Sequence, residues 1–317
     1  MLRRRFWHRS ARRPAQAGFT LLDLLVGVAI ASVVILAIGT AVILMTQGWT
    51  DQQARLQAQQ SLRAAVADIS REVRLAGACM LPYWTGTAPP ATFQPLDGTH
   101  NGTTDTIVVR WNPTCAQATL TSACNQCGSI PVDNVTNFQP TTWAYLHGTS
   151  QNQYFLIRSI TGNTLNVDPS TPVTANYATG TSVYGVEQWT FAISSTCSGC
   201  GGSPTLTLQT LSVPQTPLVK GIESLSIQYI LNRTYASGTC NGQTGGTPNL
   251  CIVNLPGSGT SPASDWQLVR VVTFNIGARS TSTVWGAGTS DGLLRLTEYF
   301  EIAPRNFVFN RQNGGRL

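Results

Sequence analysis

An uncharged apolar segment near the N-terminus constrains this chain more than any other feature. From Leu24 to Met45 there are 22 residues without a charge. At a rise of about 1.5 Å per residue, a helix of this length crosses the roughly 30 Å hydrocarbon core of a bilayer. Six arginines precede the segment, and none lies between Gly18 and Arg55. The positive-inside rule therefore predicts a single-pass protein with a cytoplasmic N-terminus and an exported C-terminal part.

Three kinds of segment fit this pattern: a cleaved secretory signal, a plain membrane anchor, or an anchor that is processed at its N-terminal edge. The apolar run is long for a signal peptide, and no A-x-A-like cleavage site follows it. A plain anchor does not need Asp23, whose ionised carboxylate costs a few kcal/mol at the membrane edge. A free α-ammonium, made by cleavage between Gly18 and Phe19, would be a suitable partner. Gly18 has no side chain to oppose an extended backbone in a protease cleft.

The residues from Gly18 to Val26, Gly-Phe-Thr-Leu-Leu-Asp-Leu-Leu-Val, resemble the class III signal of type IV pilins and type II secretion pseudopilins. The resemblance implies that a prepilin peptidase cleaves after Gly18 and N-methylates Phe19. It also implies that Asp23 pairs with the N-terminus of a neighbouring subunit during assembly. The family normally has Glu at this position, so the carboxylate here is one methylene shorter.

Charge is distributed very unevenly along the chain. The formal net charge is +6, but six arginines lie in the leader, and after Gly18 there are 13 Arg and one Lys against 14 Asp plus Glu. The mature chain is therefore formally neutral and gives no electrostatic support for nucleic-acid binding.

A second helical pattern follows the apolar run. Five apolar residues recur at steps of four, three, four and three, which predicts one buried stripe: Leu62, Val66, Ile69, Val73 and Ala76. Charged residues are predicted on the other faces: Arg55, Arg63, Asp68, Arg71, Glu72 and Arg74. Gly77 is predicted to end the helix. We expect four parts: a cleaved leader (1–18), an apolar membrane and assembly helix (19–46), an amphipathic helical spine (47–77) and a periplasmic β-rich head (78–317).

The head is rich in Thr, Ser, Gly and Asn and predicts antiparallel sheet with loops at 79–104, 196–204 and 234–262. Apolar, aromatic and β-branched runs predict strands at 106–111, 142–146, 154–160, 164–167, 182–193, 205–211, 222–231, 268–276 and 293–302. The expected fold class is α+β, with the long helix packed on the sheet. Residues 218–229, 268–280 and 296–306 are similar to PilW-type minor pilins and the related J-type pseudopilins.

Eight cysteines allow either a disulfide framework or a metal site. Two C-x-x-C pairs would suit a four-thiolate zinc site, but an exported head lies in an oxidising compartment where thiols pair. We expect disulfides, with no metal and no cofactor. The expected pairs are Cys240 with Cys251 and Cys197 with Cys200, while two bridges near the helix end share Cys79, Cys115, Cys124 and Cys127.

Catalysis finds little support in the sequence. Residues 288–292 match G-x-S-x-G, but a strand-like run follows the serine and no histidine lies beyond His147. We therefore expect a non-enzymatic minor pilin of the PilW type, in the bacterial inner membrane before assembly and in the pilus afterwards. Its expected partners are other minor pilins, the major pilin, prepilin peptidase, the inner-membrane assembly platform and membrane lipid, with no nucleic acid. The alternatives are a J-like pseudopilin, or a tip adhesin or DNA-uptake pilin.

Overall fold

The computed structural model describes residues 20–80, 95–99, 101, 104–148, 152–232, 250–254, 269–284 and 289–304. Within them the chain forms one long helix, α1 (Leu21–Leu75), followed by antiparallel strands, so the α+β prediction is confirmed. The chain divides into two compact units, residues 1–52 and 53–317. The strands are β1 (Leu96–Thr99), β2 (Thr106–Trp111), β3 (Gln117–Thr119), β4 (Cys124–Asn125), β5 (Ser129–Pro131), β6 (Trp143–His147), β7 (Asn152–Thr161), β8 (Thr164–Val167), β9 (Asn176–Tyr177), β10 (Ser182–Gly185), β11 (Glu187–Ser194), β12 (Thr205–Thr210), β13 (Thr216–Lys220), β14 (Ile222–Asn232), β15 (Leu250–Asn254), β16 (Val269–Thr283) and β17 (Leu293–Ile302).

The C-terminal half of α1 is the spine of the second unit. Four of the five predicted stripe residues are buried, and Val66 is partly buried against the same core. Gly77 has φ 72°, a left-handed conformation that ends the helix as predicted. The prediction for Glu72 was wrong, because this residue is buried rather than on a solvated face.

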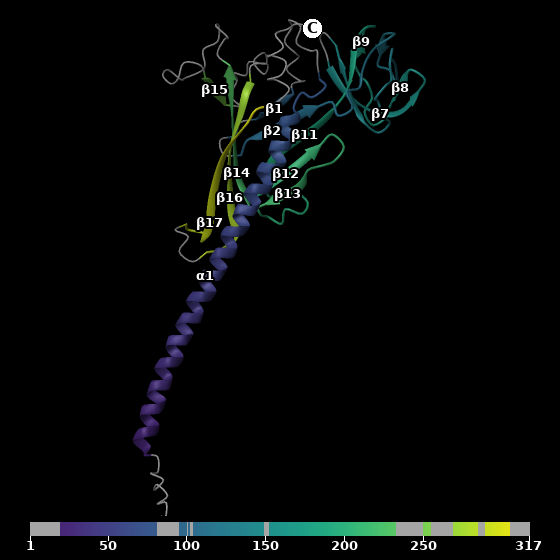
Figure 1. The fold of residues 1–317 in the computed structure, drawn as a ribbon. Helices are drawn as coiled ribbons and strands as arrows, with labels where there is room; N and C mark the ends of the chain where they lie inside the picture. Colours follow the sequence, from purple (N-terminus) through teal and green to yellow (C-terminus); the bar gives the residue numbers. More distant parts are fainter. Residues whose placement is uncertain are drawn as a thin grey trace, which may run out of the picture. The chain divides into compact units, whose positions relative to one another are not determined.

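Two antiparallel sheets share one hydrophobic core with α1 (Figure 1). The central sheet has the strand order β1-β2-β11-β12-β13, and the C-terminal sheet has the order β15-β14-β16-β17. The core takes Ile69 and Val73 from α1, Ile107 and Phe191 from the central sheet, and Phe274 from the C-terminal sheet. Apolar residues from three elements thus leave water together, which is the main stabilising term for this unit.

Asp105 is a buried connection between the two sheets. Its main-chain N–H donates to the carbonyl of Leu225 at 2.8 Å. Its carboxylate accepts the N–H of Ile227 at 2.8 Å and that of Asn101 at 2.9 Å. A fully buried carboxylate is therefore satisfied by two backbone donors, one four residues away and one in β14, 122 residues away, as buried polar groups require.

Residues 112–186 form a separate subdomain, inserted between two paired strands of the central sheet. Trp111, the last residue of β2, lies directly opposite Glu187, the first residue of β11. The inserted strands have the order β3-β10-β6-β7-β8-β5, and Leu120 pairs with Val132 beyond the ends of β3 and β5. This last pair closes the sheet into a six-stranded barrel, which we call the inserted barrel.

The inserted barrel has a core of its own. Residues such as Leu146, Phe155, Ile157 and Leu165 are fully buried there, and none of them belongs to the core around α1. In Figure 1, barrel strands β7 and β8 lie beyond the end of β11, away from β14, β16 and β17. The predicted continuous strand 182–193 was therefore wrong, because β10 belongs to the barrel and β11 to the central sheet.

Several strands lie where the sequence predicted loops. The interval 79–104 contains β1, and the interval 234–262 contains β15. Both are edge strands that pair with longer neighbours, so their main-chain hydrogen bonds depend on tertiary context more than on their own composition. The bounds of β2, β8 and β17 agree with the predicted runs.

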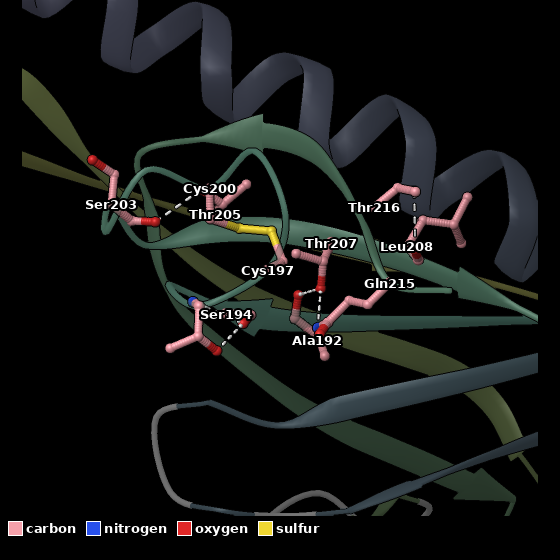
Figure 2. The surroundings of a disulfide bond; sticks show 11 residues. Ala192, Ser194, Cys197, Cys200, Ser203, Thr205, Thr207, Leu208, Gln215 and Thr216 are labelled. Carbon is pink, nitrogen blue, oxygen red and sulfur yellow. Dashed lines mark hydrogen bonds between the residues drawn. A yellow bond between two sulfur atoms is a disulfide. The ribbon is translucent and has the colours of Figure 1, made fainter. Parts of the chain in front are cut away.

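The connection between β11 and β12 is held by a disulfide and by threonine hydroxyls (Figure 2). Cys197 and Cys200 are bonded. Thr207 Oγ1, on a fully buried residue, donates to the carbonyl of Ala192 at 2.9 Å and accepts from Gln215 Nε2 at 2.7 Å. The hydroxyl thus supports the pairing of β12 where its register with β13 shifts.

Candidate functional site

The candidate site is the N-terminal half of α1, whose surface is apolar on all sides. Every residue from Thr20 to Thr46 is exposed, and sixteen large apolar side chains between Leu21 and Met45 are about half exposed or more. Among the described residues, α1 is the helix that is long and apolar enough to cross a membrane. A helix that is hydrophobic all round normally lies in lipid or among other protein segments.

The free-energy cost of leaving this surface in water is large. At roughly 1.5 kcal/mol for each large apolar side chain, sixteen of them amount to about 24 kcal/mol. The net stability of a whole domain is only about 5–15 kcal/mol. The segment therefore requires a covering by lipid or by other protein helices.

Polar side chains within the apolar half satisfy their own hydrogen bonds. The hydroxyls of Ser32, Thr40 and Thr46 donate to carbonyls three residues earlier at 2.8 Å, 2.9 Å and 2.9 Å. Such local bonds remove the penalty for placing a hydroxyl in an apolar environment, where no water is available to pair with it.

Asp23 has a local partner that the sequence interpretation did not include. Thr20 precedes the first residue of α1, and its N–H and its hydroxyl both donate to Asp23 Oδ2, at 3.2 Å and 2.7 Å. The N–H of Asp23 in turn donates to Thr20 Oγ1 at 3.3 Å. This reciprocal pair is a capping box, and the Thr-x-x-Asp spacing would have revealed it.

The capping box gives the Asp23 carboxylate a structural role within its own chain. A carboxylate in the first turn also interacts favourably with the positive end of the helix dipole. Asp23 therefore contributes to the start of its own helix, in addition to any contact with another subunit. The predicted cleavage residues Gly18 and Phe19 lie outside the described residues.

The spine half of α1 carries a buried carboxylate, Glu72. Arg71 Nε donates to Glu72 Oε1 at 2.6 Å, although the Arg71 side chain is itself largely exposed. Burial raises the pKa of the Glu72 carboxyl, Arg71 opposes this shift, and the nearby negative charge of Glu187 adds to it. The Arg71 guanidinium also lies 5.8 Å from the ring centre of Trp189, so the ion pair and a cation–π contact hold the same arginine.

The described cysteines are paired. Cys79 is bonded to Cys115 and Cys124 to Cys127, in addition to Cys197 with Cys200. The first bridge ties the end of α1 to the start of the inserted barrel, and the second lies within the barrel. In the structure both C-x-x-C pairs are thus disulfides. Cys240 and the side chain of Cys251 lie outside the described residues.

A cleft of about 200 Å³ lies where the inserted barrel meets the central sheet. Thr141, Thr142 and Trp143 line it from the barrel, and Glu187 of β11 lines it together with Leu211 and Ser212 of the turn after β12. Trp143 Nε1 donates to Ser212 Oγ at 2.8 Å across the junction. Sequence reasoning missed this site because its two sides are far apart in the chain.

Other sequence candidates do not come together. The described part of the G-x-S-x-G match, residues 289–292, forms the turn before β17, whereas a nucleophile elbow requires a helix after the serine. His147 lies on β6, where burial lowers its pKa. Among the described residues no group of three or more His, Cys, Asp or Glu side chains is arranged to hold a metal ion.

Comparison with known proteins gives no family for this chain, so its function is argued from its own residues and fold. No model of a known protein family matches the chain, and no curated protein matches it. A long apolar N-terminal helix whose second half packs on antiparallel sheets, with disulfides, is an architecture consistent with type IV pilins.

Proposed function

We propose that this chain is a non-enzymatic subunit of a pilin-type filament, processed between Gly18 and Phe19 and acting as a PilW-like minor pilin. The observation that carries the proposal is the uncovered apolar half of α1, continuous with a helix whose second half is the buried spine of a folded unit. Lipid covers the apolar half before assembly, and neighbouring pilin helices replace that lipid in the filament.

The proposed role is in a complex that initiates or caps a type IV pilus, together with other minor pilins and the major pilin. A J-like minor pseudopilin at the tip of a type II secretion pseudopilus has the same architecture. Pull-down of the processed chain with each set of partners separates these two machines.

The first experiment tests processing. The chain is expressed with and without prepilin peptidase, and intact mass and N-terminal sequencing are recorded. The expected product begins at N-methylated Phe19, and only in the presence of the peptidase. Gly18→Leu should block this cleavage. Retention of residues 1–18 in both hosts would reduce the segment to a membrane anchor and refute the proposal.

A second experiment separates the two roles of Asp23. Asp23→Ala removes the carboxylate and with it the two hydrogen bonds that Thr20 donates, whereas Thr20→Ala removes the cap hydroxyl and keeps the carboxylate. If pairing between subunits sets the register, Asp23→Ala should reduce filament assembly while leaving processing intact, and Thr20→Ala should retain most of the assembly. Equal loss in both variants would assign Asp23 to capping alone.

A further inference from the structure

The inserted barrel is not required by the pilin-type core. Its interior residues and those of the core around α1 are separate sets, and Trp111 and Glu187 already lie opposite each other in the central sheet. A two-residue hairpin turn could connect them directly. A folded module carried at this position, beyond what the core needs, calls for a function of its own.

The barrel is almost uncharged. Within residues 112–186 the only Asp, Glu, Lys or Arg residues in the sequence are Asp133, Arg158 and Asp168, while Thr, Ser, Asn and Gln are abundant. Binding of a polyanion such as nucleic acid depends on several Lys or Arg side chains that neutralise phosphates. A surface of hydroxyls and amides instead suits a neutral ligand with many hydrogen-bonding groups.

The junction that holds the cleft is fixed by packing and hydrogen bonds. Met80, Tyr145 and Val186 form a small buried cluster there, with Trp143 and Leu211 packed against it. Arg110, a residue of the central sheet, donates through Nε to Gln188 Oε1 at 2.6 Å, and the barrel's Tyr154 hydroxyl lies 3.4 Å from the same oxygen. The two walls of the cleft are therefore held together from several directions, as a preorganised binding site requires.

The groups that line the cleft offer three complementary contacts. Trp143 supplies an aromatic ring, whose negative face attracts weakly positive C–H groups. The Ser212 hydroxyl accepts the Trp143 N–H, which leaves its own O–H as a donor. Glu187 Oε1 accepts the N–H of Trp189 at 2.8 Å, and a carboxylate has about four acceptor positions in all.

We propose that this cleft binds one sugar ring of a neutral glycan, so that the inserted barrel gives the filament subunit a glycan-recognition site. A pyranose presents hydroxyls that donate to Glu187 and accept from Ser212, and a C–H face that packs on Trp143. A volume of about 200 Å³ suits a single ring rather than a long chain, with further units extending into solvent.

The test uses the full chain purified in an amine-oxide detergent, since maltoside or glucoside detergents carry sugars that would compete. Binding is measured on a printed array of neutral, sialylated and sulfated glycans, and dissociation constants are then determined for the glycans that bind. Glu187→Gln replaces the charged acceptor by a weaker neutral one, and Ser212→Ala removes the hydroxyl; each should weaken binding about tenfold or more. Arg158→Gln, an exposed change on β7 outside the cleft, is the matched control and should bind as the wild type does.

Circular dichroism of each variant checks that the fold is retained. Neutral-glycan binding that is lost in Glu187→Gln and Ser212→Ala but kept in Arg158→Gln supports the site. The proposal is overturned if no neutral glycan binds, if both cleft variants bind normally, or if acidic glycans bind and Arg158→Gln abolishes that binding. The readout involves neither processing nor filament assembly, so this inference and the proposed function can fail separately.

Discussion

Gly221 lies at the crossing from the central sheet into the C-terminal sheet, between β13 and β14. Its φ is 84°, and its N–H donates to the carbonyl of Pro204 at 2.8 Å. Its own carbonyl accepts the N–H of Arg279 at 2.7 Å. A Cβ added at this position would lie 2.8 Å from the Arg279 carbonyl oxygen, which is closer than real Cβ atoms approach. We predict that Gly221→Ala strongly destabilises the second unit.

The expected magnitude has two parts. A left-handed alanine costs about 1–2 kcal/mol, and the reduced freedom of the unfolded chain returns about 0.4–1 kcal/mol of this, which leaves roughly 1 kcal/mol. Relieving the contact moves the Arg279 carbonyl and stretches the two hydrogen bonds of Gly221, each contributing about 1 kcal/mol. The sum is about 3 kcal/mol, or a decrease in Tm of about 6–12 °C for a unit of this size.

Gly292→Ala is the matched control, because Gly292 also has a positive φ, 67°, and precedes a strand of the same C-terminal sheet. A Cβ there meets Thr283 at an ordinary 3.5 Å, so only the conformational part remains, with a Tm decrease of about 2–4 °C. Thermal unfolding of the full chain in detergent, followed by near-ultraviolet circular dichroism, compares the two. Equal decreases in Tm would show that the close approach to Arg279 does not matter and would refute the reasoning.

Two further predictions concern the disulfides and the buried carboxylate. Replacing both cysteines of Cys79–Cys115, which are 36 residues apart, should lower the free energy of unfolding by about 4 kcal/mol. The same change at Cys197–Cys200, 3 residues apart, should lower it by about 2 kcal/mol; denaturant titration measures both, and a larger effect of the shorter loop would contradict the loop-entropy argument. The folded-state pKa of Glu72 is raised, chiefly by burial, so its stabilising contribution is complete below about pH 4 and is lost as pH rises through that raised pKa. The stability of Glu72→Gln relative to wild type should therefore increase as pH rises from 4 to 7. A decrease in this relative stability over the same pH range would refute the prediction.

The inserted barrel interrupts two neighbouring strands of the central sheet. The central sheet pairs β2 directly with β11, although the residues at their junction, Trp111 and Glu187, are separated by the whole barrel. The pairing is compatible with a short hairpin, so the core and the barrel are structurally separable. The proposed glycan site would thus add recognition to the proposed filament subunit at a single strand connection.

Local patterns in the sequence were sufficient for the elements that depend on neighbouring residues. The apolar run to Met45, the buried stripe on α1 and the end of the helix at Gly77 follow from spacing along one helix. The bounds of β2, β8 and β17 follow from runs of apolar and β-branched residues. The Thr20–Asp23 capping box is also visible in the sequence as a Thr-x-x-Asp spacing, although the charge of Asp23 at the membrane edge equally predicts a partner from another subunit.

Tertiary structure alone decided where the chain changes sheet and which polar groups are buried. The run 182–193 reads as one strand because each half is apolar and β-branched, yet its two halves pair with different partners, β6 and β2. Glu72 lies three residues after the buried Ile69 and is buried itself, with Glu187 of β11 close by; the helical period allows this position, but the approach of β11 is a tertiary contact. The cleft joins Trp143 to Ser212, 69 residues apart. Such contacts depend on strand pairing over long separations, and the sequence by itself determines the local periodicity but not these partners.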